Sequence, residues 1–129
     1  MRMLALCILL SGCGDNVMSA EDAKQAYLGL DASIDKAIQL GFDGFNAASS
    51  ANIAPQMTTG TIKGTLTVTG QVDQGSSANK GMRLATSYVM YNDDNKTTYD
   101  TDMAALPALD MMLKGIPTGT LTGTFAGTS

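Results

Sequence analysis

The chain is organised around one segment, Thr61-Ile62-Lys63-Gly64-Thr65-Leu66-Thr67-Val68-Thr69-Gly70-Gln71-Val72. Its even positions are apolar or glycine, and its odd positions are polar, mostly threonine. Because successive side chains of a strand point to opposite faces, this alternation predicts a β-strand with one buried and one solvated face. Threonine suits the solvated face, since β-branched residues favour strands. The glycines on the buried side predict a bend, a bulge or a close approach between sheets.

Upstream of this strand, the apolar residues follow the period of a helix. Ser19 is a suitable N-cap, and the acids Glu21 and Asp22 suit the positive end of a helix. Apolar or small residues then recur in steps of three and four, at Ala23, Tyr27, Leu30, Ile34, Ala37 and Gly41. This spacing predicts a helix over about residues 20–40 that ends at Gly41.

Residues 42–54 are rich in alanine, serine and asparagine. They are compatible with a second short helix that turns Phe42 and Phe45 inward and ends before Pro55.

Downstream of the first strand, we predict a loop at residues 74–81 and a returning strand at residues 82–91. In that strand Leu84, Tyr88 and Met90 share one face, with Thr86 between them. A polar turn at residues 92–96 and a short strand at residues 97–102 follow. Residues 109–114 also alternate, which favours a strand, although a helix is possible there. The last run, residues 119–127, alternates again.

The last run repeats the first strand. Residues 60–66 and 119–125 share the pattern Gly-Thr-apolar-x-Gly-Thr-apolar. Two copies so far apart do not make a solenoid, and we expect them to occupy two equivalent positions in one sheet. No return strand follows the second copy before Ser129, so its threonine-glycine edge is predicted to be exposed. We expect either that the natural chain continues or that this edge pairs with a partner, such as another envelope protein.

Together these elements predict an α+β fold that is mainly β. An N-terminal helix packs on an antiparallel sheet of about five strands, which curls towards a sandwich or open barrel and is incomplete at the C-terminus if the chain continues. Residues 20–129 form a single domain, helical over residues 20–54 and β-rich over residues 57–128. A hydrophobic fraction of 44% is too high for a disordered chain.

The charge balance argues against nucleic acid as a partner. The chain has 8 basic and 12 acidic residues, a formal net charge of −4. Phosphate contacts made by basic side chains supply most of the affinity for nucleic acids, and this chain has no basic patch in its sequence.

The N-terminus carries the layout of an export signal. A basic residue, Arg2, precedes an apolar run that ends in small residues and a cysteine, Leu10-Ser11-Gly12-Cys13. The last four residues resemble the lipobox of bacterial lipoproteins. The resemblance implies that residues 1–12 are a signal peptide cleaved before Cys13, which then carries a diacylglyceryl group on its sulfur and a palmitate-type acyl group on its amine. Residues 13–19 are then a short tether.

The resemblance also implies a place in the cell. Two or more acyl chains anchor a protein stably to a membrane, so the partner of Cys13 is the lipid bilayer of the bacterial envelope. In enteric bacteria an aspartate directly after the lipidated cysteine favours the inner membrane, and Gly14 stands there. The outer membrane is therefore favoured. Cys13 is the only cysteine left after cleavage, so lipidation also explains an unpaired cysteine in an exported chain.

The side chains of common catalytic sites are scarce in this chain. The sequence contains no histidine, which excludes Ser-His and Cys-His nucleophiles and histidine metal sites. Residues 77–80 match the Ser-x-x-Lys motif of penicillin-binding proteins, but the Ser-Asp-Asn and Lys-Thr-Gly partners are missing. A Gly/Ser-rich loop is the better interpretation of that segment, and we predict a non-enzymatic protein without a cofactor.

Two candidate binding sites each have a plainer interpretation. Asp93, Asp94, Asp100 and Asp102 are weak calcium candidates, because carboxylates are hard ligands, but their spacing is not that of a calcium loop and such clusters commonly form turns. Tyr88, Tyr91 and Tyr99 could line a groove, although packing on the sheet is the favoured interpretation.

The sequence therefore leads to a lipid-anchored envelope protein with a structural or binding β domain. The alternative is a carrier in which the helix closes a curved sheet over a small apolar ligand. The residues predicted to line that ligand site are Leu66, Val68, Tyr88 and Phe125.

Overall fold

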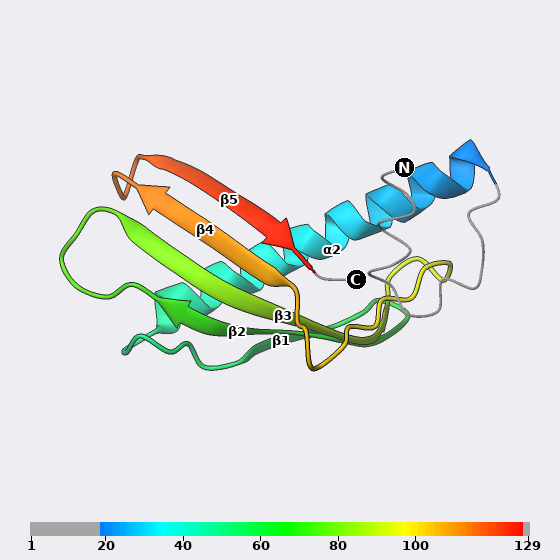
Figure 1. Ribbon diagram of the computed structural model, residues 1–129, viewed down its shortest axis with the longest axis horizontal. Helices are drawn as coiled ribbons and strands as arrows, with labels where there is room; N and C mark the ends of the chain where they lie inside the picture. Colours follow the sequence, from blue (N-terminus) through cyan, green and yellow to red (C-terminus); the bar gives the residue numbers. More distant parts are fainter. Residues whose placement is uncertain (1–18, 128–129) are drawn as a thin grey trace.

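The computed structural model describes residues 19–127. One long helix lies on a five-stranded antiparallel sheet whose strands follow one another in the order β1-β2-β3-β4-β5 (Figure 1). The elements are α2 (Ala20–Ala47), β1 (Gln56–Thr59), β2 (Lys63–Val72), β3 (Lys80–Asn92), β4 (Ala108–Lys114) and β5 (Thr120–Ala126). The sheet is open, since β1 and β5 form its two edges and do not pair with each other. The predicted helix on a five-stranded antiparallel sheet is confirmed.

The helix begins as predicted but is longer than predicted. The Ser19 side chain accepts a hydrogen bond of 3.1 Å from the backbone N–H of Asp22, which caps the first turn. The predicted stop at Gly41 and the separate second helix are wrong, because α2 continues to Ala47. Phe42 and Phe45 therefore lie on the same helix, partly buried against the core.

Gly41 serves close packing instead of helix termination. It is buried in α2, and a Cβ atom at this position would lie 2.6 Å from Leu84 Cδ1 and 3.2 Å from Met111 Cε. Gly44, one turn later, is placed in the same way against Ile53, where the corresponding distance to Cδ1 is 2.7 Å. These two glycines let the helix backbone approach the sheet where a side chain would hold it away.

The organising strand is confirmed with a shorter span and an irregular pairing at one glycine. Leu66, Val68 and Val72 are buried in β2, as the alternation predicted, whereas Ile62 precedes the strand and is 50% exposed. The register with β3 shifts between Lys63 and Thr65. Gly64, between them, has φ 79°, a left-handed conformation that glycine adopts without strain. Gly64 alone lies opposite two residues of β3, Met90 and Tyr91, so a bulge, one of the three features expected at these glycines, is present with its extra residue in β3.

Two strand predictions are wrong. Residues 97–102 form no strand, and only an isolated bridge joins Tyr99 to Tyr91. The fifth strand is instead β1, which pairs Gln56–Thr59 with β2. Met90 was expected on the buried face of β3, but it is 48% exposed. Its φ of 49° interrupts the alternation, so the next residue, Tyr91, faces the core.

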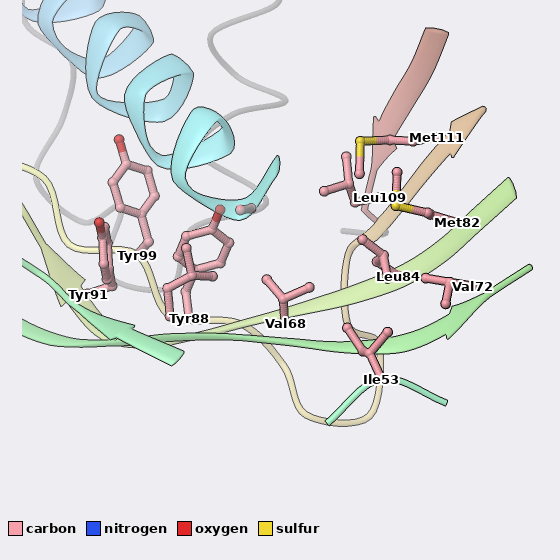
Figure 2. Packing of buried hydrophobic residues seen from close by; sticks show 12 residues of the cluster. Ile53, Val68, Val72, Met82, Leu84, Tyr88, Tyr91, Tyr99, Leu109 and Met111 are labelled. Carbon is pink, nitrogen blue, oxygen red and sulfur yellow. The ribbon is translucent and has the colours of Figure 1, made fainter. Parts of the chain in front are cut away.

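The core lies between α2 and the inner face of the sheet, and tyrosines fill one end of it. Tyr88 and Tyr91 meet edge to face with ring centroids 5.5 Å apart, and Tyr99 packs 6.0 Å from Tyr88. Figure 2 shows the three rings directed from the strands and the following loop towards the helix. The Tyr88 hydroxyl donates a hydrogen bond of 3.2 Å to the backbone oxygen of Ser33. The tyrosines therefore pack the sheet, as favoured from the sequence.

The helix covers the sheet unevenly. It packs chiefly on β1, β2 and β3. Every residue of β5 is exposed except Phe125, which is half-buried. The repeated Gly-Thr motif thus occupies an interior strand, β2, and an edge strand, β5. The expectation of two equivalent positions is wrong, because one copy lies under the helix and the other lies outside it.

Replacement of Gly41 by leucine is expected to lower the free energy of unfolding by about 1–3 kcal/mol, because the new side chain must enter the space that Leu84 and Met111 fill. The matched control is Ala32→Leu, at an exposed position of the same helix, which we expect to change stability by less than about 0.5 kcal/mol. Urea unfolding followed by circular dichroism measures both. Equal effects of the two substitutions would contradict the close packing of Gly41.

Candidate functional site

The densest polar cluster of the described residues is centred on the Asp93 carboxylate, just after β3. Lys36 Nζ, from the middle of α2, donates to both carboxylate oxygens at 2.8 and 3.0 Å. The Tyr91 hydroxyl donates at 2.7 Å. Thr61, in the turn between β1 and β2, donates through its backbone N–H at 2.8 Å and through its hydroxyl at 3.0 Å. The carboxylate therefore ties the helix, β3 and the β1–β2 turn together.

This hydrogen bonding holds Asp93 in its charged form. Burial acts to raise the pKa of the carboxyl, but the hydrogen bonds from Lys36, Thr61 and Tyr91 outweigh it and lower the pKa from 3.8 to about 2. For Lys36, burial acts to lower the pKa, and the hydrogen bond to Asp93 reverses this and raises it. Lys36 Nζ also lies 5.5 Å from the centroid of the Tyr91 ring. Both groups are thus charged and paired at neutral pH.

The chemistry of this cluster is that of a structural clamp. Five donated hydrogen bonds occupy both oxygens of the Asp93 carboxylate, so this group is poorly placed to act as a base. The pKa of Tyr91 is raised, chiefly by burial, and the Tyr91 hydroxyl donates to the Asp93 carboxylate. The hydroxyl of Tyr91 therefore stays protonated. We therefore assign the cluster to stability.

Replacement of Asp93 by asparagine is expected to cost about 1–2 kcal/mol of unfolding free energy at pH 7, because the charge-assisted hydrogen bonds are lost and Lys36 is left without its partner. The pKa of Asp93 is lower in the folded protein than its ordinary value of 3.8. Its contribution is therefore present above about pH 4 and is lost as the pH falls towards about 2.

Urea unfolding measured from pH 7 to pH 2 tests this expectation. The difference between wild type and Asp93→Asn should shrink below about pH 4. Asp73, whose pKa is lowered by the Gly81 N–H and by Arg83, titrates in both proteins and cancels in the comparison. Asp35→Asn, at an exposed helix position, is the control. A difference that does not depend on pH would contradict the clamp.

Of the four calcium candidates, Asp93 belongs to the cluster described above, and Asp94 and Asp102 make contacts typical of turns. Asp94 Oδ1 accepts two backbone N–H groups at 2.8 Å, from positions two and three residues downstream. Asp102 Oδ1 accepts the N–H two residues downstream, also at 2.8 Å, and Asp100 Oδ1 accepts the Met90 N–H at 3.3 Å. Within residues 19–127, no three acidic or cysteine side chains gather in a way that could hold a metal ion. The local contacts of Asp94 and Asp102 match the turn interpretation, whereas the contact of Asp100 is with β3.

The residues predicted to line a carrier site fall into two groups. Leu66, Val68 and Tyr88 are at most 3% exposed and belong to the packed core. Phe125 is half-buried at the rim of that core, on β5. Cys13 and the whole signal-peptide prediction lie outside the described residues, so lipidation stays a prediction.

The segment that matches Ser-x-x-Lys is a loop as far as Asn79, and its Lys80 is the first residue of β3. The Ser77 hydroxyl accepts the backbone N–H of Asn79, and Lys80 Nζ donates to the backbone oxygen of Gly75. The two groups of the motif are thus each engaged with backbone atoms of this loop.

The exposed surface of β3, β4 and β5 is the candidate binding surface. An open depression of about 470 Å³ lies on it, lined by Gly81, Met82, Arg83, Asp110, Met111, Met112, Thr122, Gly123 and Thr124. Met112 of β4 pairs with Gly81 of β3 on one side and with Thr122 of β5 on the other. The depression lies beside this methionine, where Gly81 has no side chain. The alternation in the sequence predicted these strands but not the depression, since the pairing of β3 with β4 cannot be read from either strand alone.

Comparison with protein-family models, with curated proteins and with solved structures finds no match to this chain. In the part of the chain that the structure describes, no helix has the length and apolar character needed to cross a bilayer.

Proposed function

We propose that this protein is a lipid-anchored, non-enzymatic component of the bacterial cell envelope whose β domain binds a protein partner through strand β5. The observation that carries the binding role is the state of β5. Within residues 19–127 this strand pairs with β4 on one side only, and its residues are exposed on both faces apart from Phe125. The outer edge of such a strand offers a row of backbone donors and acceptors to an incoming strand.

The two edges of the sheet differ in how they are protected. The edge strand β1 has four residues, directly follows Pro55 and is packed against by α2. β5 has seven residues, with no proline and no charged side chain. Short length, proline and a covering helix are devices that prevent edge pairing. β5 lacks all three, which supports a role in binding.

The anchor rests on the lipobox-like segment Leu10-Ser11-Gly12-Cys13. In this proposal the acyl chains on Cys13 hold the domain at the membrane, and residues 13–19 connect them to α2, which begins at Ala20. A tether of this length keeps the domain close to the bilayer, where partners share its surface.

Mass spectrometry of the N-terminal peptide from protein expressed in a bacterial host tests the anchor. We expect the mature chain to begin at Cys13 and to carry the added mass of its acyl chains, with palmitate label incorporated into the protein. Cys13→Ser should abolish both processing and label. Cys7→Ser, within the segment to be removed, is the matched control and should leave the mature protein unchanged.

A chain that retains residues 1–12 and a free thiol at position 13 would rule out the anchored location. The same result would leave the geometry of β5 unchanged, so the binding role of β5 needs a test of its own.

A further inference from the structure

We propose that the partner of β5 is β5 of a second copy of this chain. The two strands pair antiparallel about a two-fold axis at Gly123 and join two five-stranded sheets into one of ten strands. This inference rests on the proposed role of β5 as the binding edge and names its partner.

The charge of the strand favours pairing with itself. Lys114 at the end of β4 is the last charged side chain of the sequence, and β5 has none. Two copies of β5 bring the same set of side chains together, so charges of one sign on this strand would repel those of the second copy. A charged partner would gain no complementary contact from this strand either. A neutral edge is thus best matched by another neutral edge.

The order of side chains along β5 is self-complementary in one register. Phe125 pairs with Leu109 of β4, and Leu121 pairs with Leu113, so Leu121, Gly123 and Phe125 share the inner face of the sheet. A two-fold axis at Gly123 places Leu121 of each copy opposite Phe125 of the other, so the interface contains two such pairs. Thr122 then lies opposite Thr124 on the outer face, also twice.

Neighbouring registers lose these contacts. With the axis at Thr122 or at Thr124, the large apolar residues Leu121 and Phe125 lie opposite glycines. A register shifted by a single residue places inner-face leucine opposite outer-face threonine, because the side-chain period of a strand is two. Only the axis at Gly123 pairs aromatic with aliphatic side chains on one face and threonine with threonine on the other, and such cross-strand pairs stabilise sheets.

The second copy also covers apolar surface that α2 leaves open. Leu121 is 44% exposed, and Phe125 and Leu113 are only partly buried at the rim of the core. With the two-fold axis perpendicular to the sheet, both copies of α2 lie on the same face of the joined sheet. The four inner residues Leu121 and Phe125 of the two chains then form one apolar strip between the two helices.

The interface is small, and the proposed membrane anchor compensates for its size. A pair of seven-residue strands buries less than the roughly 1,200–2,000 Å² of a standard stable interface. Confinement of both copies to one bilayer surface raises their effective concentration and favours pairing without new contacts. We therefore expect a weak, concentration-dependent dimer in solution.

Charge substitutions on the outer face test both the partner and the register. In Thr122→Lys/Thr124→Lys, lysines face each other twice across the two-fold axis, whereas in Thr122→Glu/Thr124→Lys each glutamate faces a lysine. Both positions are exposed, so the monomer should fold in either variant, which circular dichroism checks. The chain has a net charge of −4, so two added lysines reduce the overall repulsion between copies, and loss of the dimer would report the local pairing.

The measurement is sedimentation equilibrium at protein concentrations up to about 1 mM, a range that reaches weak self-association. The full chain carries Cys7→Ser and Cys13→Ser in every variant, so neither disulfides nor lipid contribute. We expect wild type to dimerise, the double-lysine variant to lose about tenfold or more in affinity, and the glutamate–lysine variant to retain the dimer.

Three outcomes would overturn the proposal: a wild-type chain that stays monomeric throughout, a dimer that the double-lysine variant leaves unchanged, or equal loss in both variants. The last would exclude the Gly123 register, and the first would leave β5 to a strand from another protein. Because the chains are unlipidated, failure here leaves the anchoring result at Cys13 unaffected, and failure of anchoring leaves the dimer measurement valid.

Discussion

The fold depends on the close contact between one face of α2 and the inner face of β2 and β3. The alternation in β2 supplies a buried row that includes Leu66 and Val68, both fully buried. Gly41 and Gly44 supply the flat helix surface that meets the sheet. Burial of apolar side chains between two layers is the dominant favourable term in folding. Most of the stability of a helix in a protein comes from packing of this kind, and a sheet likewise needs its apolar face to be packed.

The helix protects only part of the sheet, and this unevenness separates stability from binding. The tyrosine cluster and the Asp93–Lys36 clamp lie at the end of β3, under or beside α2. The β4–β5 hairpin extends the same sheet away from this covered part (Figure 1). Regions with few buried contacts open most easily, and binding surfaces are commonly drawn from them. The exposed edge at β5 is therefore consistent with a stable domain that presents one reactive strand.

The sequence predicted the elements whose pattern is local. Alternation identified β2, β4 and β5, and the cap at Ser19 identified the start of α2. The end of the helix was wrong because Gly41 reports packing against Leu84, a contact that no local pattern contains. β1 was missed because four residues are too few to show a period. Likewise, no local pattern links Asp93 to Lys36, which lies 57 positions away in the sequence. The exposure of β5, by contrast, was predicted, and β5 is the last strand in the order of the sheet.

Hydrogen exchange measured by mass spectrometry in dilute solution tests the central claim, that α2 protects one part of the sheet and leaves the β5 edge unprotected. The account predicts slow exchange in β2 and β3, close to the rate of global unfolding, and exchange at least about tenfold faster in β5. Equal protection of β2 and β5 in the monomer, or faster exchange in β2, would contradict it.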